Sequence, residues 1–157
     1  MPKISTFLTF DHQAEDAANF YTSVFKNSKI VSTSRYGDTG PGPKGGLMTA
    51  TISLDGQELI LLNGGPSFTF TPGFSLFVSC ETQAEVDDYW SQLTAAGGKE
   101  VACGWVTDKF GVSWQIVPTV LMKLIADKDA RKAERVMQAM LKMVKLDIAE
   151  LQKAAAG

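Results

Sequence analysis

The chain reads Phe74-Ser75-Leu76-Phe77-Val78-Ser79-Cys80 and then Gln83-Ala84-Glu85. An offset of 70 residues earlier, it reads Ile4-Ser5-Thr6-Phe7-Leu8-Thr9-Phe10 and then Gln13-Ala14-Glu15. Both seven-residue runs are rich in aromatic, β-branched and small residues, which is typical of strands. In both copies, apolar residues spaced by three and four follow, as on one side of an amphipathic helix. We therefore predict a repeated unit that begins with a strand and continues into a helix.

Each predicted helix is followed by strand-like runs. In the first copy these runs are 29–36, 47–54 and 58–62, and in the second copy they are 99–103, 105–107 and 112–117. An Asp55-Gly56 pair separates two of them and is a strong signal for a β-hairpin. Thr82 and Glu85 form a capping box for the second helix, whereas Asp11 or His12 begins the first. The sequence thus predicts an α+β fold, with strand, helix and three strands repeated twice in tandem.

A helical tail follows Pro118. Asp127 or Asp129 is expected to cap a long helical run from Ala130 to Ala156, because apolar residues recur there at helical spacing. We divide the chain into a domain at 1–118, with unit one at 1–70 and unit two at 71–118, and a C-terminal helical tail at 119–157.

Composition excludes several classes of function. A formal net charge of −2 gives no basic surface for a nucleic acid. No run of about 18 apolar residues occurs, so we expect no membrane span, and the first residues do not have the pattern of a secretory leader. The two cysteines do not form a CxxC pair and suit a reducing compartment, so we expect a cytoplasmic protein.

Three strings make the chain resemble the PhnB-like family of the glyoxalase/bleomycin resistance/dioxygenase (vicinal oxygen chelate) superfamily. They are Phe10 to Tyr21, the Gly64-Gly65-Pro66 segment with Phe68 and Phe70, and Asp108 to Pro118, the most specific. The tail from Lys132 to Ala149 is similar to that family's C-terminal extension. The resemblance implies two sheets that curve around a cleft, completed in a homodimer, with substrate and any metal on the concave faces.

The resemblance also implies where a divalent metal would be held. Superfamily members that bind one generally place His, Gln or Glu on the first, fourth, fifth and eighth strands. The matching positions here are Ser5 or Thr6, then one of Leu61, Leu62 and Asn63, then Ser75, and finally Gln115. Neutral amides and hydroxyls bind a dication weakly. We therefore expect no cofactor and no tight metal site, although weak binding of a divalent metal stays open.

The candidate cleft combines those polar positions with aromatic residues. Aromatic side chains on sheet faces either line an apolar cavity or belong to the core, and for Trp105 and Trp114 both interpretations stay open. The predicted ligand-binding residues are Thr6, Asn63, Ser75, Phe77, Trp105, Trp114 and Gln115.

Other reactive residues have simpler interpretations. His12 is expected to cap a helix, and Cys80 and Cys103 are expected to be structural, because no second histidine is present to activate a thiol. Residues 37–46 form either a mobile lid or a plain hairpin connection.

Three functions fit this sequence to different degrees. The hypothesis we favour is a protein that binds a small, partly apolar molecule without a tight metal. The alternative is a metal-dependent isomerase, lyase or dioxygenase, which the missing ligands count against. Methyl transfer from S-adenosylmethionine, suggested by the label that PhnB-like relatives often carry, is least supported, because no strand followed by a Gly-rich loop and a helix is found.

Overall fold

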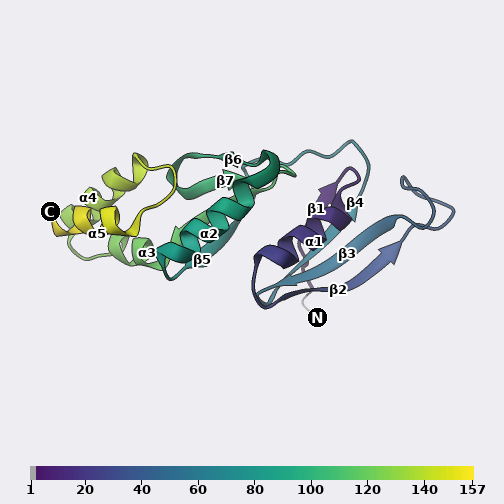
Figure 1. Ribbon diagram of the computed structural model, residues 1–157, viewed down its shortest axis with the longest axis horizontal. Helices are drawn as coiled ribbons and strands as arrows, with labels where there is room; N and C mark the ends of the chain where they lie inside the picture. Colours follow the sequence, from purple (N-terminus) through teal and green to yellow (C-terminus); the bar gives the residue numbers. More distant parts are fainter. Residues whose placement is uncertain (1–2) are drawn as a thin grey trace. The chain divides into compact units, whose positions relative to one another are not determined.

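A computed structural model describes residues 3–157 of the chain. The chain divides into two compact units, Met1–Thr69 and Phe70–Gly157 (Figure 1). Within residues 3–157, no helix is long and apolar enough to cross a membrane.

The first unit is a four-stranded sheet with one helix. Its elements are β1 (Phe7–Phe10), α1 (Ala14–Val24), β2 (Ser28–Arg35), β3 (Leu47–Leu54) and β4 (Gln57–Asn63). The strand order is β1-β4-β3-β2, in which β1 runs parallel to β4 and the other neighbours are antiparallel. Because side chains alternate along a strand, one face of the sheet buries its apolar residues beneath α1. Leu8, Ile52, Leu59 and Leu61 lie on this buried face.

The loop that joins β2 to β3 folds back onto Tyr36. The backbone amide of Tyr36 donates to the carbonyl of Gly46, and the amide of Gly45 donates to the carbonyl of Tyr36. A Cβ atom at Gly42 would stand 2.3 Å from the Tyr36 ring, so only glycine permits this close approach. These contacts favour the hairpin connection over a mobile lid for residues 37–46.

The second unit repeats this arrangement and adds the tail. Its sheet contains β5 (Ser75–Cys80), β6 (Lys99–Glu100), β7 (Trp105–Thr107) and β8 (Ser113–Pro118), in the order β5-β8-β7-β6. The helix α2 (Gln83–Thr94) lies on one face of this sheet, as Figure 1 shows. Short 3-10 turns η1 (Ala95–Gly97) and η2 (Ala102–Gly104) flank β6. The repeated strand, helix and three strands confirm the predicted α+β fold.

The predicted capping box is confirmed. Thr82 Oγ1 accepts a hydrogen bond from the backbone amide of Glu85, and the Glu85 carboxylate accepts one from the amide of Glu81. Two strand boundaries are corrected, because the first strand begins at Phe7 instead of Ile4, and the strand predicted at 99–103 ends at Glu100.

The tail forms three helices, α3 (Thr119–Ile125), α4 (Ala130–Leu141) and α5 (Ile148–Ala156). The prediction of one long helical run from 130 to 156 is therefore wrong, although Asp129 does cap α4. The carbonyls of Met143 and Val144 accept hydrogen bonds from the amides of Cys103 and Gly104, which holds this segment out of a helix.

The side chain of Gln83 on α2 also binds the backbone of the tail. The Gln83 amide group donates to the carbonyl of Leu146 at 3.1 Å, and its side-chain oxygen accepts from the amide of Ile148 at 2.8 Å. Leu146 is fully buried in a cluster that joins the tail to β8. Its members are Val117, Leu121, Val136, Leu146, Leu151 and Ala155. The tail is therefore part of the second unit's core.

Candidate functional site

Each sheet has one face covered by its helix and one face turned away from it, which we call the open face. On β1, Leu8 and Phe10 are buried toward α1, whereas Phe7 is 52% exposed. On β5, Cys80 is buried toward α2, whereas Phe77 is 49% exposed. Phe7 and Phe77 are separated by the same 70 residues as the sequence repeat, so they occupy equivalent places on the two open faces.

A row of three side chains crosses the open face of the second sheet. Phe77 pairs with Gln115 on β8, and Gln115 pairs with Trp105 on β7. Gln115 Nε2 donates a hydrogen bond of 3.0 Å to Ser75 Oγ. Paired residues share a face of a sheet, so the structure brings four of the seven predicted ligand-binding residues together. We call Phe77, Gln115 and Trp105 the second-sheet row.

Trp114 lies on the opposite face of the same sheet. It is 2% exposed, and its indole Nε1 donates to Asp108 Oδ2 at 2.8 Å. The other carboxylate oxygen of Asp108 accepts from the amides of Phe110 and Val112 at 2.9 and 3.0 Å. Asp108 therefore organises the β7–β8 turn and orients Trp114 into the core beneath α2. The core interpretation of Trp114 describes its place better than the cavity interpretation.

Thr6 and Asn63 belong to the first unit and have different surroundings. Asn63 Oδ1 accepts from the backbone amide of Ala14 at 2.8 Å, and its Nδ2 donates to the carbonyl of Leu47. Asn63 thus stabilises the start of α1, a structural role. The carbonyl of Thr6 accepts from the amide of Ile60, and its side chain lines a pocket.

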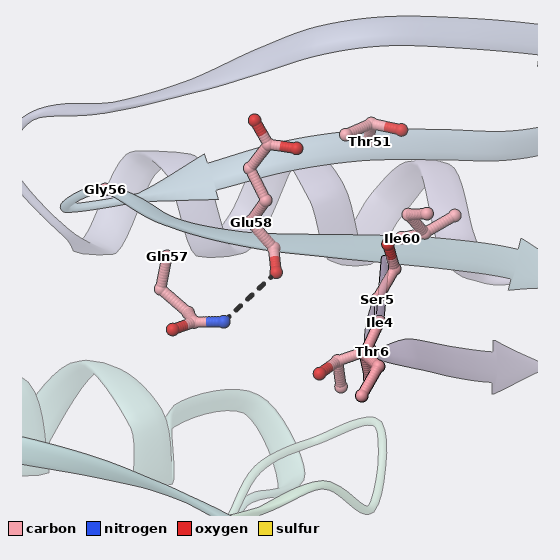
Figure 2. A pocket seen from close by; sticks show the side chains of 8 residues that line it. All are labelled: Ile4, Ser5, Thr6, Thr51, Gly56, Gln57, Glu58 and Ile60. Atoms are coloured by element: carbon pink, nitrogen blue, oxygen red, sulfur yellow. Dashed lines mark hydrogen bonds between the residues drawn. The ribbon is translucent and has the colours of Figure 1, made fainter. Parts of the chain in front are cut away.

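This pocket, which we call the β1–β4 pocket, lies on the open side of the first sheet and has a volume of about 350 Å³. Figure 2 shows Thr51 on β3, Glu58 and Ile60 on β4, and Ile4, Ser5 and Thr6 on the segment that leads into β1. Gly56 and Gln57 complete its lining. Sequence reasoning found only Thr6 as a ligand-binding residue here. The signal for the others was available, because Leu59 and Leu61 are buried and alternation places Glu58 and Ile60 on the opposite face.

The two open faces have matching positions with different chemistry. Phe7 pairs with Ile60, and Ile60 pairs with Thr51, which makes a first-sheet row equivalent to Phe77, Gln115 and Trp105. Next to these rows, Glu58 in the first sheet takes the place of Ser113 in the second. The second-sheet row is therefore more aromatic, and the first sheet carries the acidic side chain.

The four superfamily metal positions do not fit a tight divalent ion. Ile60 pairs with Phe7 as Gln115 pairs with Phe77, so the register corrects the fourth-strand position from 61–63 to Ile60. The positions then hold Ser5 or Thr6, Ile60, Ser75 and Gln115, a set without carboxylate or imidazole. Within residues 3–157, no three His, Cys, Asp or Glu side chains gather as a metal site would need.

The connections that precede the two long sheet helices do not suit a nucleotide-like methyl donor. A Gly-rich turn after a strand lets a helix N-terminus approach such a cofactor closely. Residues 11–13 join β1 to α1, and residues 81–82 join β5 to α2. Neither connection contains glycine.

The remaining reactive side chains lie apart from the second-sheet row or are shielded. His12 is exposed, and its Nδ1 lies 3.4 Å from Asp11 Oδ2. Cys80 is fully buried, and this burial, with the nearby carboxylates of Glu85 and Glu81, raises the pKa of its thiol to about 12. A thiol held in its neutral form is a poor nucleophile. Cys103 is half-buried in the turn that binds the tail.

Comparison with known proteins gives consistent relatives. The sequence model of a family described as 3-demethylubiquinone-9 3-methyltransferase matches residues 2–117. A solved structure described as a putative 3-demethylubiquinone-9 3-methyltransferase, PhnB protein, from Bacillus cereus is 43% identical, with a TM-score of 0.69. It covers 75% of this chain and 100% of its own. None of the curated proteins matches this chain.

More distant structures share the fold alone. Protein PA1353 from Pseudomonas aeruginosa is 21% identical, covers 75% of this chain and 98% of its own, and has a TM-score of 0.61. The fosfomycin resistance protein FosX from Listeria monocytogenes, solved with Mn(II) and sulfate, is 15% identical, with a TM-score of 0.51. It covers 73% of this chain and 90% of its own. These likenesses confirm the expected glyoxalase-type architecture.

Proposed function

We propose that this chain, which belongs to the 3-demethylubiquinone-9 3-methyltransferase (PhnB-like) family, binds a small, partly apolar molecule on the open face of its second sheet. The observation that carries the proposal is the second-sheet row, in which an exposed Phe77 and a half-buried Trp105 flank Gln115. Large aromatic side chains that stay accessible on one sheet face are suited to stack on a flat or apolar ligand.

Polar groups within this row provide orientation. The side-chain Nε2 of Gln115 donates a hydrogen bond to Ser75. Among the described residues, the side-chain oxygen Oε1 of Gln115 accepts no hydrogen bond. A hydroxyl or amide N–H on a ligand can donate to that oxygen. The ligand class that matches is therefore a small molecule with an aromatic or alkyl body and one hydrogen-bond donor.

Binding in this proposal does not use a tightly held metal. Ser75 and Gln115 occupy two of the superfamily's metal positions, and their neutral oxygens bring no charge to offset the dehydration of a dication. FosX is described with Mn(II), but a 15% identity carries only the fold to this chain, not the ion.

A second copy of the chain completes the cleft in this proposal. Phe7 and Phe77 leave about half of each ring accessible on the open faces, and burying aromatic surface favours association. We expect a homodimer in solution.

Native mass spectrometry of the untagged protein is the first test. It reads subunit number, bound metal and any retained organic mass together. A metal-free dimer, with or without a retained organic molecule, is the expected result. A stoichiometric divalent metal would overturn the metal-free part of the proposal, and a monomer would overturn the dimeric cleft.

The site itself is tested with 2-naphthol, an aromatic body with one hydroxyl donor, titrated into ¹⁵N-labelled protein. We expect amide shifts centred on Ser75, Phe77, Trp105 and Gln115. Phe77→Ser is expected to weaken binding about tenfold, because it removes the stacking surface. Val31→Ser is the matched control, since Val31 is an apolar side chain of similar exposure that lies on β2 of the first sheet. Equal losses in both variants, or shifts elsewhere, would contradict a site on the second sheet.

A further inference from the structure

The β1–β4 pocket differs from the second-sheet row in having a negative charge. The polar residues that line it are Ser5, Thr6, Thr51, Gln57 and Glu58. No lysine, arginine or histidine lines it. We propose that the β1–β4 pocket binds a small organic amine in its protonated form, with the ammonium group held by the Glu58 carboxylate.

The fold does not require a carboxylate at this position. The equivalent place in the second sheet holds Ser113, which is 4% exposed. The same strand pairing is therefore made with a small neutral side chain in one unit and with a charged side chain in the other. A charge that the fold can do without is free to serve a ligand.

Among the described residues, Glu58 differs from three other carboxylates of its own unit in being unpaired, a property that it shares with Asp16 outside the pocket. Glu15 pairs with Arg35, Asp38 pairs with Lys44, and Asp55 accepts a hydrogen bond from Asn27. The Glu58 carboxylate makes no ion pair or hydrogen bond within residues 3–157, and the side-chain amide of Gln57 donates to the backbone carbonyl of Glu58 instead. An ammonium group supplies up to three N–H donors and the opposite charge, which matches an unpaired carboxylate.

The neighbours of Glu58 define the rest of the ligand. Thr51 lies diagonally across from Glu58 on the same face of the β3–β4 pair, so its hydroxyl can share the ammonium. Ile4 and Ile60 add alkyl surface to the lining. This combination selects a primary amine with a short alkyl or aryl group over a fully polar cation or an acid.

The test uses benzylamine as the probe, with benzyl alcohol as the neutral analogue and benzoate as the anionic one. Each compound is titrated into the ¹⁵N-labelled full chain at neutral pH. We expect benzylamine to bind about tenfold or more tightly than benzyl alcohol, with amide shifts at Thr6, Thr51, Gly56, Glu58 and Ile60, and benzoate not to bind there. Added salt should weaken the binding.

Glu58→Gln keeps the size and polarity of the side chain and removes only its charge. This variant is expected to bind benzylamine about tenfold more weakly and to leave benzyl alcohol unchanged. Asp16→Asn is the matched control, because Asp16 is another exposed carboxylate of the first unit but lies on α1, outside the pocket. Circular dichroism of both variants checks that each is folded.

Three results would overturn the proposal. They are an absence of benzylamine binding at millimolar concentration, equal binding of the amine and the alcohol, and an equal loss in Asp16→Asn and Glu58→Gln. The inference does not depend on the second-sheet row, since the 2-naphthol and benzylamine titrations report on different residues.

Discussion

The two units have nearly the same strand pairing but opposite chemical character on their open faces. In the first, Phe7, Ile60 and Thr51 stand beside Glu58, and in the second, Phe77, Gln115 and Trp105 stand beside Ser113. The faces that meet the helices differ less, since both are apolar and buried. Packing beneath the helix constrains one face of each sheet, and the other face is available for specialisation.

The units also differ in what stabilises them. The first unit contains one helix, whereas the second adds α3, α4 and α5 and buries Leu146 among them. Residues 119–157 contain eight Lys or Arg and five Asp or Glu, whereas residues 70–118 contain two and six. The tail is therefore net basic and the rest of its unit net acidic, and Lys145 Nζ of the tail lies 2.8 Å from Asp87 Oδ1 of α2.

The largest expected effect comes from Leu146→Ala, which tests whether the tail belongs to the core of the second unit. We expect a loss of about 2–5 kcal/mol in the free energy of unfolding, because the change leaves a cavity in a fully buried cluster. Relative to the wild type, hydrogen exchange in Leu146→Ala should accelerate more in residues 70–157 than in residues 3–69. Leu141→Ala, at a side chain 61% exposed, is the control, with an effect of at most about 0.5 kcal/mol. Equal acceleration of hydrogen exchange in both units would contradict the assignment of the tail to the core of the second unit.

Asp108→Asn probes a difference between the two hairpins. The buried carboxylate of Asp108 accepts three hydrogen bonds through its two oxygens. Asparagine replaces one of these oxygens with an NH₂ group, which cannot accept a hydrogen bond. We expect a loss of about 1–3 kcal/mol by chemical denaturation, with a shift in Trp114 fluorescence. Asp55→Asn, in the exposed β3–β4 turn of the first unit, should change stability little, because asparagine tolerates the positive φ of 48° there. Similar losses in both variants would contradict this distinction.

The Cys80 thiol should make the stability of the second unit sensitive to alkali. Its pKa in the folded protein is raised to about 12 from an ordinary value of 9.0, so folding favours the protonated thiol. The stabilisation is complete below pH 9 and is lost as the pH rises toward 12, because the unfolded thiol ionises first. Cys80→Ala should lose less stability over this range than the wild type, as measured by urea unfolding at each pH. An equal loss in Cys80→Ala and in the wild type would show that the Cys80 thiol does not cause the sensitivity to alkali.

The smallest effect is expected at the contact between the tail and α2. Hydrogen bonds from Lys145 and Gln83 lower the pKa of the Asp87 carboxyl, so this contribution is present above pH 3.8 and is lost as the pH falls through the lowered pKa. Both partners are about half exposed, so Lys145→Met should cost only about 0.2–1 kcal/mol at neutral pH. Lys128→Met, at an exposed lysine without an ion pair among the described residues, should cost less. The melting temperatures of both variants are measured at pH 3 and pH 7. Equal changes in melting temperature for the two variants would show that the Lys145–Asp87 ion pair does not stabilise the tail.

The repeat could be predicted because local patterns and the fold agree. The runs before Gln13 and Gln83, the Thr82 capping box and the Asp55-Gly56 turn all act over a few residues. The break between α4 and α5 could not be predicted in this way. Residues 142–147 contain good helix formers, and the segment is held out of a helix by hydrogen bonds from Cys103 and Gly104, distant in the sequence.

The candidate site was predicted in part for a similar reason. Ser75, Phe77, Trp105 and Gln115 share a face because alternate residues of paired strands do so. The place of Trp114 could have been predicted, because Ser113, Trp114, Gln115 and Ile116 alternate between polar and apolar residues, and neighbours in a strand point to opposite faces. Alternation with Leu59 and Leu61 places Glu58 on the open face of β4, but no motif marks an isolated acidic side chain in a strand as a ligand-binding residue.

The hydrogen bonds between the Gln83 side chain and the tail have a consequence for the order in which the chain folds. Gln83 is synthesised well before Leu146 and Ile148, the residues whose backbone its side chain binds, at sequence separations of 63 and 65. On a ribosome that adds about 5–20 residues per second, the first unit and the β5–β8 sheet emerge while this binding place is still vacant. The amphipathic start of α2 is then exposed for seconds, and a chaperone has access to the nascent second unit until the tail arrives.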